Sequence, residues 1–253
     1  MLFALEFPPV SHLLEWPDIL FDGTPFAINK PVLIFFAAFV LTLALFFAAG
    51  KKKLVPTGVQ NVAESAVNFI EDSVIMQTMG REGMVYLPFL LTLFFFVLFC
   101  NIFEVLPFVQ FPATSRMAIP AFLALMVWAI YNFVGLKNHG LRYFKNVMIP
   151  PGVPAPLLPL VALIEFVSTF FVRPFSLAVR LFANMLAGHL LLVTFAVLTA
   201  TLWDSSPLFA IVWAPFVVLI GLTGFEILVA LLQAFIFTIL TAVYIGGAAH
   251  PEH

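Results

Sequence analysis

Long apolar stretches dominate the pattern of the chain, and polar segments separate them. Three of these stretches have the length of one membrane-spanning helix: residues 31–49, 84–106 and 118–136. A helix needs about 20 apolar residues to cross the hydrocarbon core of a bilayer. Each of the three stretches is therefore predicted to form a single span.

Two further apolar stretches, residues 157–201 and 207–249, are about twice as long as one span requires. At about 1.5 Å per residue, the first would extend roughly 65 Å as one helix, against a hydrocarbon core of ~30 Å. The pattern predicts either four short spans or two long, strongly tilted helices that form a hairpin at Trp203–Pro207. Because residues that favour turns are scarce inside both stretches, we favour the hairpin.

The segments outside these stretches have a different character. In residues 57–79, apolar side chains recur at steps of three and four, with acidic residues such as Glu64 and Glu71 between them. This period predicts an amphipathic helix on the membrane surface, within the loop at 50–83. Residues 1–30 mix acidic residues with prolines and are expected to form an extracytoplasmic segment.

The composition agrees with a protein that lies mostly in lipid. Of the 253 residues, 63% are hydrophobic and 9% are charged, whereas soluble domains carry about 25% charged residues. The mean hydropathy is +1.11. We therefore expect one all-α integral membrane domain with about five membrane helices, the last two long and tilted, and one amphipathic surface helix.

The charge and the cysteine count exclude other classes. The net charge of −2 gives no basic surplus for binding nucleic acid. The chain has one cysteine, Cys100, so an intrachain disulfide cannot form. The loop and terminal histidines have no metal-ligand spacing, and we expect neither a metal nor a cofactor.

Basic residues give the expected orientation. They gather in the loops at 50–83 and 137–156, as Lys51, Lys52, Lys53, Arg81, Lys137, Arg142 and Lys145. Cytoplasmic loops of membrane proteins carry an excess of lysine and arginine. Both loops and the C-terminus are therefore expected in the cytoplasm, and the N-terminus outside.

Ionisable side chains also lie within the predicted spans, namely Glu104, Glu165, Arg173, Arg180, His189 and Glu226. A charge inside the membrane costs ~2.5–3.5 kcal/mol on insertion scales and marks a functional site by default. Arg173 and Arg180 are seven residues apart, so they share one face of a helix. Ser176, Arg180 and Asn184 follow at steps of four and form a stripe on that face.

The predicted hairpin relates residues of its two arms by depth. The midpoint between residue numbers 180 and 233, of Arg180 and Gln233, is about 207, which is Pro207 in the predicted turn. The midpoint between the numbers of His189 and Glu226 is about the same. The hairpin therefore places Gln233 level with Arg180, and Glu226 level with His189, about 13 Å farther outward along the helix.

These residue types suggest a proton path that ends at a fixed charge. Histidine and glutamate exchange protons at accessible pH, so His189 and Glu226 can pass a proton between them. Arg180 stays protonated, and it repels a free proton and attracts a carboxylate. Asn184 and Gln233 offer it neutral dipoles. Such a barrier is useful only if a mobile carboxylate passes Arg180. Since no other carboxylate of the chain is suited to this role, we infer that a partner protein supplies it.

Two segments resemble a known family. SLAVRLFANMLAGHLLL at 176–192 and FEILVALLQAFIFTILTAVY at 225–244 are similar to subunit a of the rotary F-type ATP synthases, the membrane stator of the motor. The chain order, length and five-helix layout are similar too. The resemblance implies a proton-translocating stator that forms two offset half-channels. Partners would be the ring of c subunits, the peripheral stalk of b subunits, the remaining ATP synthase subunits and membrane lipid.

The resemblance also implies roles for residues. Arg180 would be the essential arginine that faces the carboxylates of the c-ring, with Asn184 and Gln233 as its polar neighbours. His189 and Glu226 would line the outer half-channel, and Glu104 its mouth; Glu165 would lie near the cytoplasmic half-channel. Arg173 stands where many members have a lysine before proline. Nucleotide chemistry would belong to other subunits, so the chain alone would not be an enzyme, and the bacterial plasma membrane would be its location.

Two other classes of membrane protein are alternatives. A secondary active ion transporter would show inverted repeats and helices broken by glycine or proline, but the long segments of this chain are largely unbroken. An intramembrane enzyme would need an HExxH motif, paired carboxylates or a phosphate-binding loop. The sequence contains none of these.

Overall fold

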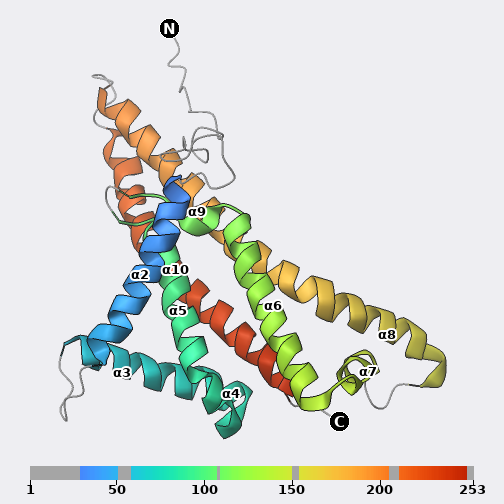
Figure 1. Cartoon of the computed structure of the whole chain (residues 1–253). Coiled ribbons are helices and arrows are strands. Elements are labelled where there is room, and N and C mark those ends of the chain that lie inside the picture. Colours follow the sequence, from blue (N-terminus) through green and yellow to red (C-terminus); the bar gives the residue numbers. More distant parts are fainter. Residues whose placement is uncertain (1–28, 51–57, 107–108, 150–153, 205–210, 250–253) are drawn as a thin grey trace.

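The computed structural model describes residues 29–50, 58–106, 109–149, 154–204 and 211–249, and every regular element in them is a helix. Figure 1 shows the arrangement of these helices. Of the features predicted above, most of the segment 1–30, the lysines 51–53 and the turn residues 205–207 lie outside the described residues.

Five helical stretches are long and apolar enough to cross a membrane: Lys30–Ala49, Gly80–Ile102, Ala118–His139, Leu158–Trp203 and Trp213–Ala249. The last two contain 46 and 37 residues and run without a break. The prediction of an all-α membrane protein whose last two helices are long is therefore confirmed, and four short spans are excluded.

The first three spans consist of ordinary single-span helices. Helix α2 covers Lys30–Ala49, and the Asn29 side chain caps it by accepting a hydrogen bond from the Val32 amide at 3.4 Å. Helix α5 covers Leu87–Ile102 and follows a 3₁₀ segment at Gly80–Tyr86. Helix α6 covers Ala118–His139.

The second span ends earlier than the pattern predicts. The expected range was 84–106, but the helix stops at Ile102 and the chain turns. The amides of Glu104 and Val105 donate to the Asn101 and Ile102 carbonyls, each at 3.1 Å. The sequence places Pro107 two residues after Val105, and a proline disfavours helix in the residue before it. Glu104 therefore lies on a turn beyond the helix.

The amphipathic segment is helical but interrupted. Helix α3 (Val59–Ile70) continues through a wide π turn (Glu71–Ile75) into helix α4 (Met76–Thr78). Its inner face buries Ile70 and Ile75 completely, while its outer face leaves Val62 exposed. In Figure 1 this segment runs across the lower ends of α2 and α5.

One short helix was not predicted. Helix α7 (Arg142–Met148) lies in what the sequence indicated as a basic loop. Its Tyr143 is 1% exposed, and the ring packs against Gly135 of α6, where a Cβ atom would leave it no room. Burial raises the pKa of Tyr143, and the nearby Arg173 opposes this rise. Tyr143 is thus the one buried residue that anchors this helix to α6.

The long hairpin is built from the remaining helices. Helix α8 (Leu158–Val167), a π turn (Ser168–Val172) and helix α9 (Arg173–Asp204) form its first arm. Helix α10 (Trp213–Ala249) forms the second arm and begins six residues later than the expected 207. In Figure 1 the first arm extends far to one side of the other helices.

The lower end of the bundle in Figure 1 gathers the C-terminal ends of two spans. The His139 Nε2 atom lies 3.0 Å from the Ala249 carbonyl oxygen, which joins the ends of α6 and α10. Gly246 of α10 packs closely against Met79, next to α4. The ends of α6 and α10 and the amphipathic segment therefore lie on the same side of the membrane domain.

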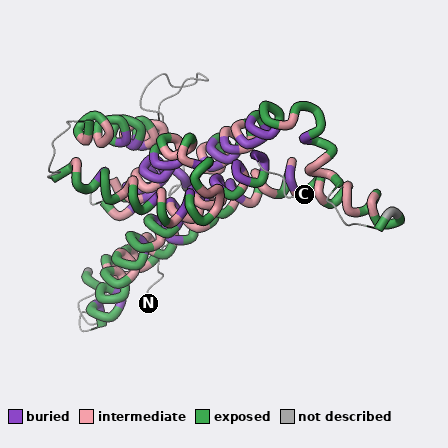
Figure 2. The backbone as a smooth tube through the Cα atoms, turned by 90° about the horizontal axis from the view of Figure 1, so that it is seen from below, coloured by how far each residue is buried: buried purple, intermediate pink, exposed green. Residues whose placement is uncertain are grey.

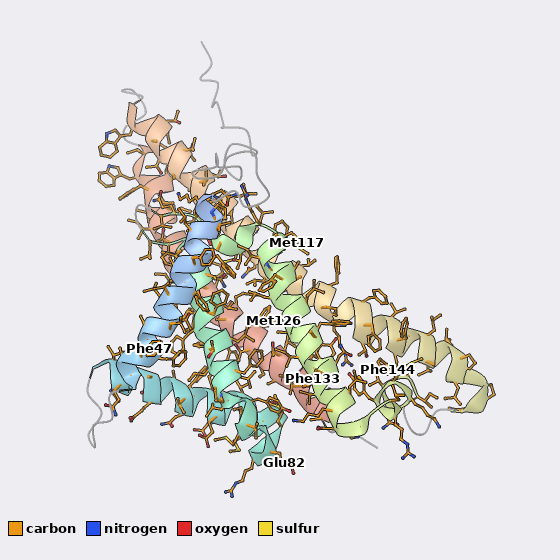
Figure 3. All side chains as sticks on the ribbon, in the orientation of Figure 1. Phe47, Glu82, Met117, Met126, Phe133 and Phe144 are labelled. Carbon is orange, nitrogen blue, oxygen red and sulfur yellow. The ribbon has the colours of Figure 1, made fainter. Side chains whose placement is uncertain are left out.

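The buried core lies where α5, α6, α9 and α10 pack together. Figure 2 shows that the buried residues gather in the middle of the molecule, where the tubes meet. Aromatic rings join α2 to this core, since Phe35 lies edge-on to Phe96 with centroids 5.2 Å apart. Figure 3 shows how densely apolar side chains cover the helices on their outer sides as well. Because lipid solvates such side chains, an apolar exterior is stable in a membrane.

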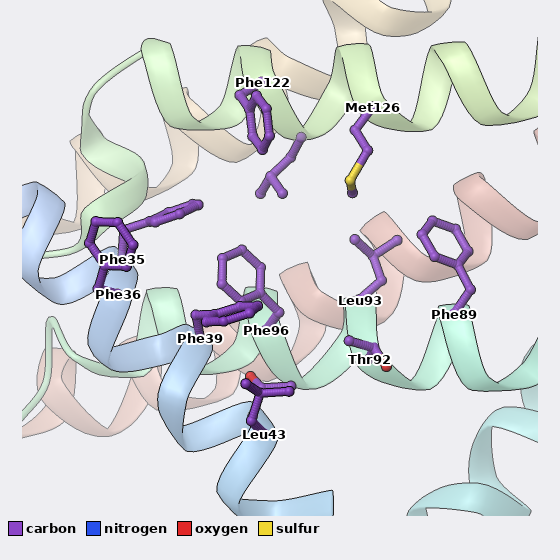
Figure 4. A pocket seen from close by; sticks show the side chains of 12 residues that line it. Phe35, Phe36, Phe39, Leu43, Phe89, Thr92, Leu93, Phe96, Phe122 and Met126 are labelled. Carbon is purple, nitrogen blue, oxygen red and sulfur yellow. The ribbon is translucent and has the colours of Figure 1, made fainter.

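An apolar groove of about 460 Å³ lies between α2, α5 and α6 (Figure 4). Aromatic and aliphatic side chains form most of its wall. The hydroxyls of Thr42 and Thr92, which also line it, donate to the Ala38 and Pro88 carbonyls of their own helices. The groove therefore suits lipid chains rather than a polar ligand.

Candidate functional site

Three predicted polar residues meet in the half of the hairpin that holds the end of α9 and the start of α10. Glu104 follows α5, His189 is on α9 and Glu226 is on α10; they are 3%, 6% and 4% exposed. The His189 Nδ1 atom lies 3.9 Å from Glu104 Oε1. Buried ionisable groups are costly unless they are paired, so this cluster in an apolar protein indicates a function.

Gly188 brings Glu226 into the cluster. A Cβ atom at this position would lie 2.6 Å from the Cδ, Oε1 and Oε2 atoms of Glu226. The carboxyl group therefore rests on the backbone of α9, one residue before His189. Only glycine allows this approach, because any side chain would occupy the place of the carboxyl group.

A cavity of about 290 Å³ adjoins the cluster. Glu104 and His189 line it together with Gln110 and Thr223, and aliphatic side chains from α9 and α10 complete the wall. A cavity of this size with several polar groups can hold water molecules. The arrangement places Glu104 and His189 beside a space that is large enough for water.

Arg180 has a different environment. It is exposed on α9, and so are Ala183 and Ala187, one and two turns farther along. Among the residues that the structure describes, no carboxylate forms an ion pair with Arg180. A guanidinium group thus lies open to an approaching partner, beside small side chains that leave room for one.

Gln233 is placed close to the level of Arg180. Because Glu226 lies against Gly188, an antiparallel arm brings Gln233, seven residues later, level with Leu181. The Gln233 side chain is 4% exposed, and its Nε2 atom finds no acceptor within the described part of the chain. Ser176 and Asn184 are half-buried on the stripe of Arg180.

The other half of the hairpin, which holds the start of α9 and the end of α10, contains a second polar group of residues. The guanidinium carbon of Arg173 lies 5.4 Å from the centroid of the Tyr244 ring on α10. Such a contact stabilises a cation where few polar partners are at hand. Glu165 is half-buried on α8, two turns before Arg173.

Tyr131 belongs to this second group, and the sequence did not indicate it. Its hydroxyl donates to the Thr169 carbonyl oxygen at 2.7 Å, inside the π turn of the long arm. A tyrosine in an apolar span is ordinary, so the residue alone carries no signal. The signal that could have indicated it is Pro174, which removes a helix donor close by.

The long arm and α10 expose apolar side chains on more than one side. Those at least 47% exposed include Leu163, Phe171, Phe175, Leu191, Val217, Phe225, Leu228 and Leu231. On α9, Leu191 lies on the side of Arg180, whereas Phe175 lies on a different side. Exposed apolar surfaces of this kind are typical of contact with lipid or with another membrane protein.

Metal ligation has no support within the described segments, since no group of three His, Cys, Asp or Glu residues lies close enough together to hold an ion. The chemistry that the site offers is proton transfer by carboxyl and imidazole groups, and a permanent cation on the same hairpin. These two kinds of group lie apart: the carboxyl and imidazole groups are buried beside the cavity of Glu104 and His189, and the cation is exposed on α9.

Comparison with known proteins agrees with the resemblance in sequence. The family model described as ATP synthase A chain matches residues 32–246. ATP synthase subunit a of Frankia alni is 43% identical over 94% of this chain and 84% of its own length. The corresponding subunit of Rhodococcus erythropolis is 41% identical over 93% of this chain and 88% of its own length. That of Nitrobacter hamburgensis is 40% identical over 91% of this chain and 92% of its own length. The chain therefore belongs to the ATP synthase subunit a family.

Proposed function

We propose that this chain is the proton-translocating stator of its ATP synthase, and that it loads and unloads the carboxylates of a c-ring beside Arg180. Membership of the family makes the chain a multi-pass membrane subunit of the complex. One observation carries the finer proposal. Arg180 is exposed on α9, on the same side as the small side chains of Ala183 and Ala187, and forms no ion pair with a carboxylate of the described residues.

The cost of that arginine argues for a partner. An unpaired arginine at mid-membrane costs ~2.5–3.5 kcal/mol on insertion scales. A carboxylate brought by a neighbouring subunit would offset this cost, because Coulomb attraction is strong where water is excluded. Since arginine does not release its proton, Arg180 would also stop protons from leaking directly between the two sides.

The outer half-channel would begin at the cavity beside Glu104. Protons would enter there and pass over His189 and Glu226, which are buried and close together through Gly188. From Glu226 the proton would neutralise a carboxylate of the ring. A neutral carboxyl group can then move into lipid, which a charged one cannot do cheaply.

The inner half-channel would run along the cytoplasmic part of the long arm. After almost a full turn of the ring, the carboxyl group would meet Arg180 and lose its proton. That proton would leave past Glu165, with Ser176 and Arg173 on the same path. Asn184 and Gln233 would orient the guanidinium without neutralising it. Each charge that crosses 100 mV would supply about 2.3 kcal/mol to rotation.

The remaining parts of the proposal concern partners and orientation. The chain would be non-catalytic by itself and would act with the c-ring, the b-subunit stalk, the other subunits and membrane lipid. We place it in the bacterial plasma membrane with its N-terminus outside. The contact of His139 with Ala249 supports a cytoplasmic C-terminus, because Lys137, Arg142 and Lys145 lie at or beside that end of α6.

The decisive experiment replaces Arg180 with alanine. In inverted membrane vesicles that contain the whole complex, Arg180→Ala should abolish ATP-driven proton pumping. Arg81→Ala serves as the matched control, because Arg81 is also exposed but lies in the 3₁₀ segment that begins the second span, away from α9, and it should pump normally. Full coupled pumping by Arg180→Ala would refute the role that we assign to Arg180.

A further inference from the structure

We propose that Tyr131 is a positioning residue, which holds the π turn of the long arm in place and so sets the rotation of α8 relative to α9. The proposal rests on the function proposed above, because its effect would reach the proton path through Glu165. It concerns a hydrogen bond that joins two spans far apart in the sequence, from the Tyr131 hydroxyl to the Thr169 carbonyl oxygen at 2.7 Å.

The backbone around Thr169 explains why this bond is needed. In an α-helix, the Thr169 carbonyl would accept from the amide of Arg173, four residues on. In this helix the Arg173 amide donates to Ser168 instead, which is the pattern of a π turn. The next possible donor is residue 174, and it is a proline without an N–H group.

The Thr169 carbonyl is therefore without a donor from its own helix. A buried carbonyl group without a partner is costly, and nearly all such groups in proteins are satisfied. Thr169 is 1% exposed, so solvent does not reach its side chain, and its own hydroxyl has no partner among the described residues. The Tyr131 hydroxyl supplies the missing donor from α6.

Packing fixes Tyr131 in the position from which it donates. The side chain is 1% exposed, and its ring lies 5.8 Å from the ring of Tyr244 on α10. Tyr244 in turn lies under the guanidinium of Arg173. The hydroxyl therefore belongs to a buried unit of α6, α9 and α10, and it cannot leave the Thr169 carbonyl without disturbing that unit.

The π turn sets which face of α8 is directed toward the proposed proton exit. Each residue of an α-helix turns by about 100°. In an uninterrupted helix, Glu165 and Arg173 would be about 80° apart around the axis. One extra residue in the wide turn changes this angle by roughly 100°, so the two side chains lie within about 20° of each other.

The stripe that carries Arg173 and Arg180 is thereby extended to Glu165. A return to a pure α-helix would turn α8 away by about a quarter of a circle. Glu165 would then lie off the line of the proposed proton exit. The hydroxyl of Tyr131 thus acts on transport through the position of Glu165 and without contact to the proton.

The test removes only the hydroxyl group. Tyr131→Phe keeps the ring and its contact with Tyr244, while the Thr169 carbonyl loses its donor. ATP-driven proton pumping per assembled complex, in inverted vesicles, should fall by about tenfold, the equivalent of one buried hydrogen bond. Tyr86→Phe is the matched control, since the Tyr86 hydroxyl makes no hydrogen bond within the described part of the chain; it should leave pumping unchanged.

A second substitution separates positioning from general damage. Pro174→Ala provides an N–H group that can donate to the Thr169 carbonyl, so the double variant Tyr131→Phe/Pro174→Ala should recover most of the lost pumping. Rotation of α8 is measured directly by labelling Glu165→Cys with a polar maleimide in a Cys100→Ser background. Tyr131→Phe should change the labelling rate several-fold, and Pro174→Ala should restore it.

Three results would overturn the inference. They are normal pumping by Tyr131→Phe, a defect that Pro174→Ala leaves unchanged, and a labelling rate at position 165 that does not respond to Tyr131→Phe. Arg180→Ala in the same vesicles distinguishes this failure from that of the proposed function. If Arg180→Ala abolishes pumping while Tyr131→Phe has no effect, only the inference about Tyr131 falls.

Discussion

A methyl group at Gly188 would test whether Glu226 must rest on the backbone of α9. In the structure, the added Cβ atom of Gly188→Ala would lie 2.6 Å from three atoms of the Glu226 carboxyl group. Ordinary contact begins at 3.4 Å, so the carboxyl group would have to withdraw by at least 0.8 Å. The substitution therefore moves the carboxyl group of Glu226 without changing any ionisable residue.

The expected effect on transport is larger than the effect on stability. The carboxyl group is the end of a flexible side chain, so it can shift at less than the ~1–3 kcal/mol that overpacking of a rigid core costs. Alanine is also a better helix former than glycine by about 1 kcal/mol, which offsets part of that cost. A displacement of about 1 Å in a reacting group can, however, lower a rate by roughly 100-fold.

The assay measures ATP-driven proton pumping per assembled complex in inverted vesicles, together with the amount of complex in the membrane. Gly188→Ala should assemble normally and pump 10- to 100-fold more slowly, by the displacement argument above. Gly221→Ala is the matched control, because it lies in α10 and its Cβ would meet nothing within 4 Å. Normal pumping by Gly188→Ala would refute the idea that transport depends on the position of Glu226.

Further predictions concern the hairpin and the inner helices. Cysteines at His189 and Glu226 should crosslink across the hairpin in oxidised membranes, and failure of this pair while a neighbouring pair crosslinks would contradict the register. Gly135→Ala should lower the amount of assembled complex on a native gel, because its Cβ would displace the buried Tyr143 ring. Burial raises the pKa of Tyr143 in the folded state, so the folded state loses stability as the pH rises above about 10, the pKa of a tyrosine in the unfolded chain. Tyr143→Phe removes this ionisation and should shift the midpoint of alkaline unfolding to higher pH. An unchanged midpoint would contradict this prediction.

Much of the fold follows from the sequence because lipid imposes a simple rule. Each span must satisfy its backbone groups internally, so an apolar stretch of sufficient length becomes a helix. The long hairpin followed from the scarcity of turn residues in 157–201 and 207–249, and the structure has two unbroken helical arms there. What the pattern could not give are the ends of helices, such as that of α5 at Ile102, which local turns decide.

The site was predictable in part for a geometric reason. In a hairpin, residues of the two arms that are equally far from the turn lie side by side. Counting from the predicted turn therefore placed Glu226 beside the segment of His189. In the structure, Glu226 lies against Gly188 of that segment. The functional roles of these residues stay predictions. The exposure of Arg180 could not be derived, because helical period shows which residues share a face but not which face a neighbour covers.

The π turn escaped prediction for a further reason. Proline inside a helix is usually treated as a break, and Pro174 indeed interrupts the apolar run. Here the helix continues, because a tyrosine from a span about 40 residues earlier satisfies the carbonyl that the proline leaves without a donor. The local sequence shows through Pro174 only that a helix donor is missing, and it does not show which distant residue supplies the replacement.

The contrast in burial between the proposed proton carriers and the arginine would have a mechanical consequence under the proposed function. His189 and Glu226 are at most 6% exposed, whereas Arg180 is exposed on one face of α9. A rotor carboxylate that slides along this face would meet the guanidinium directly, but it would reach the proton carriers only where the packing of α9 and α10 allows access. Loading would then occur at one defined angular position of the ring, displaced from Arg180, and that displacement is what would give rotation a direction.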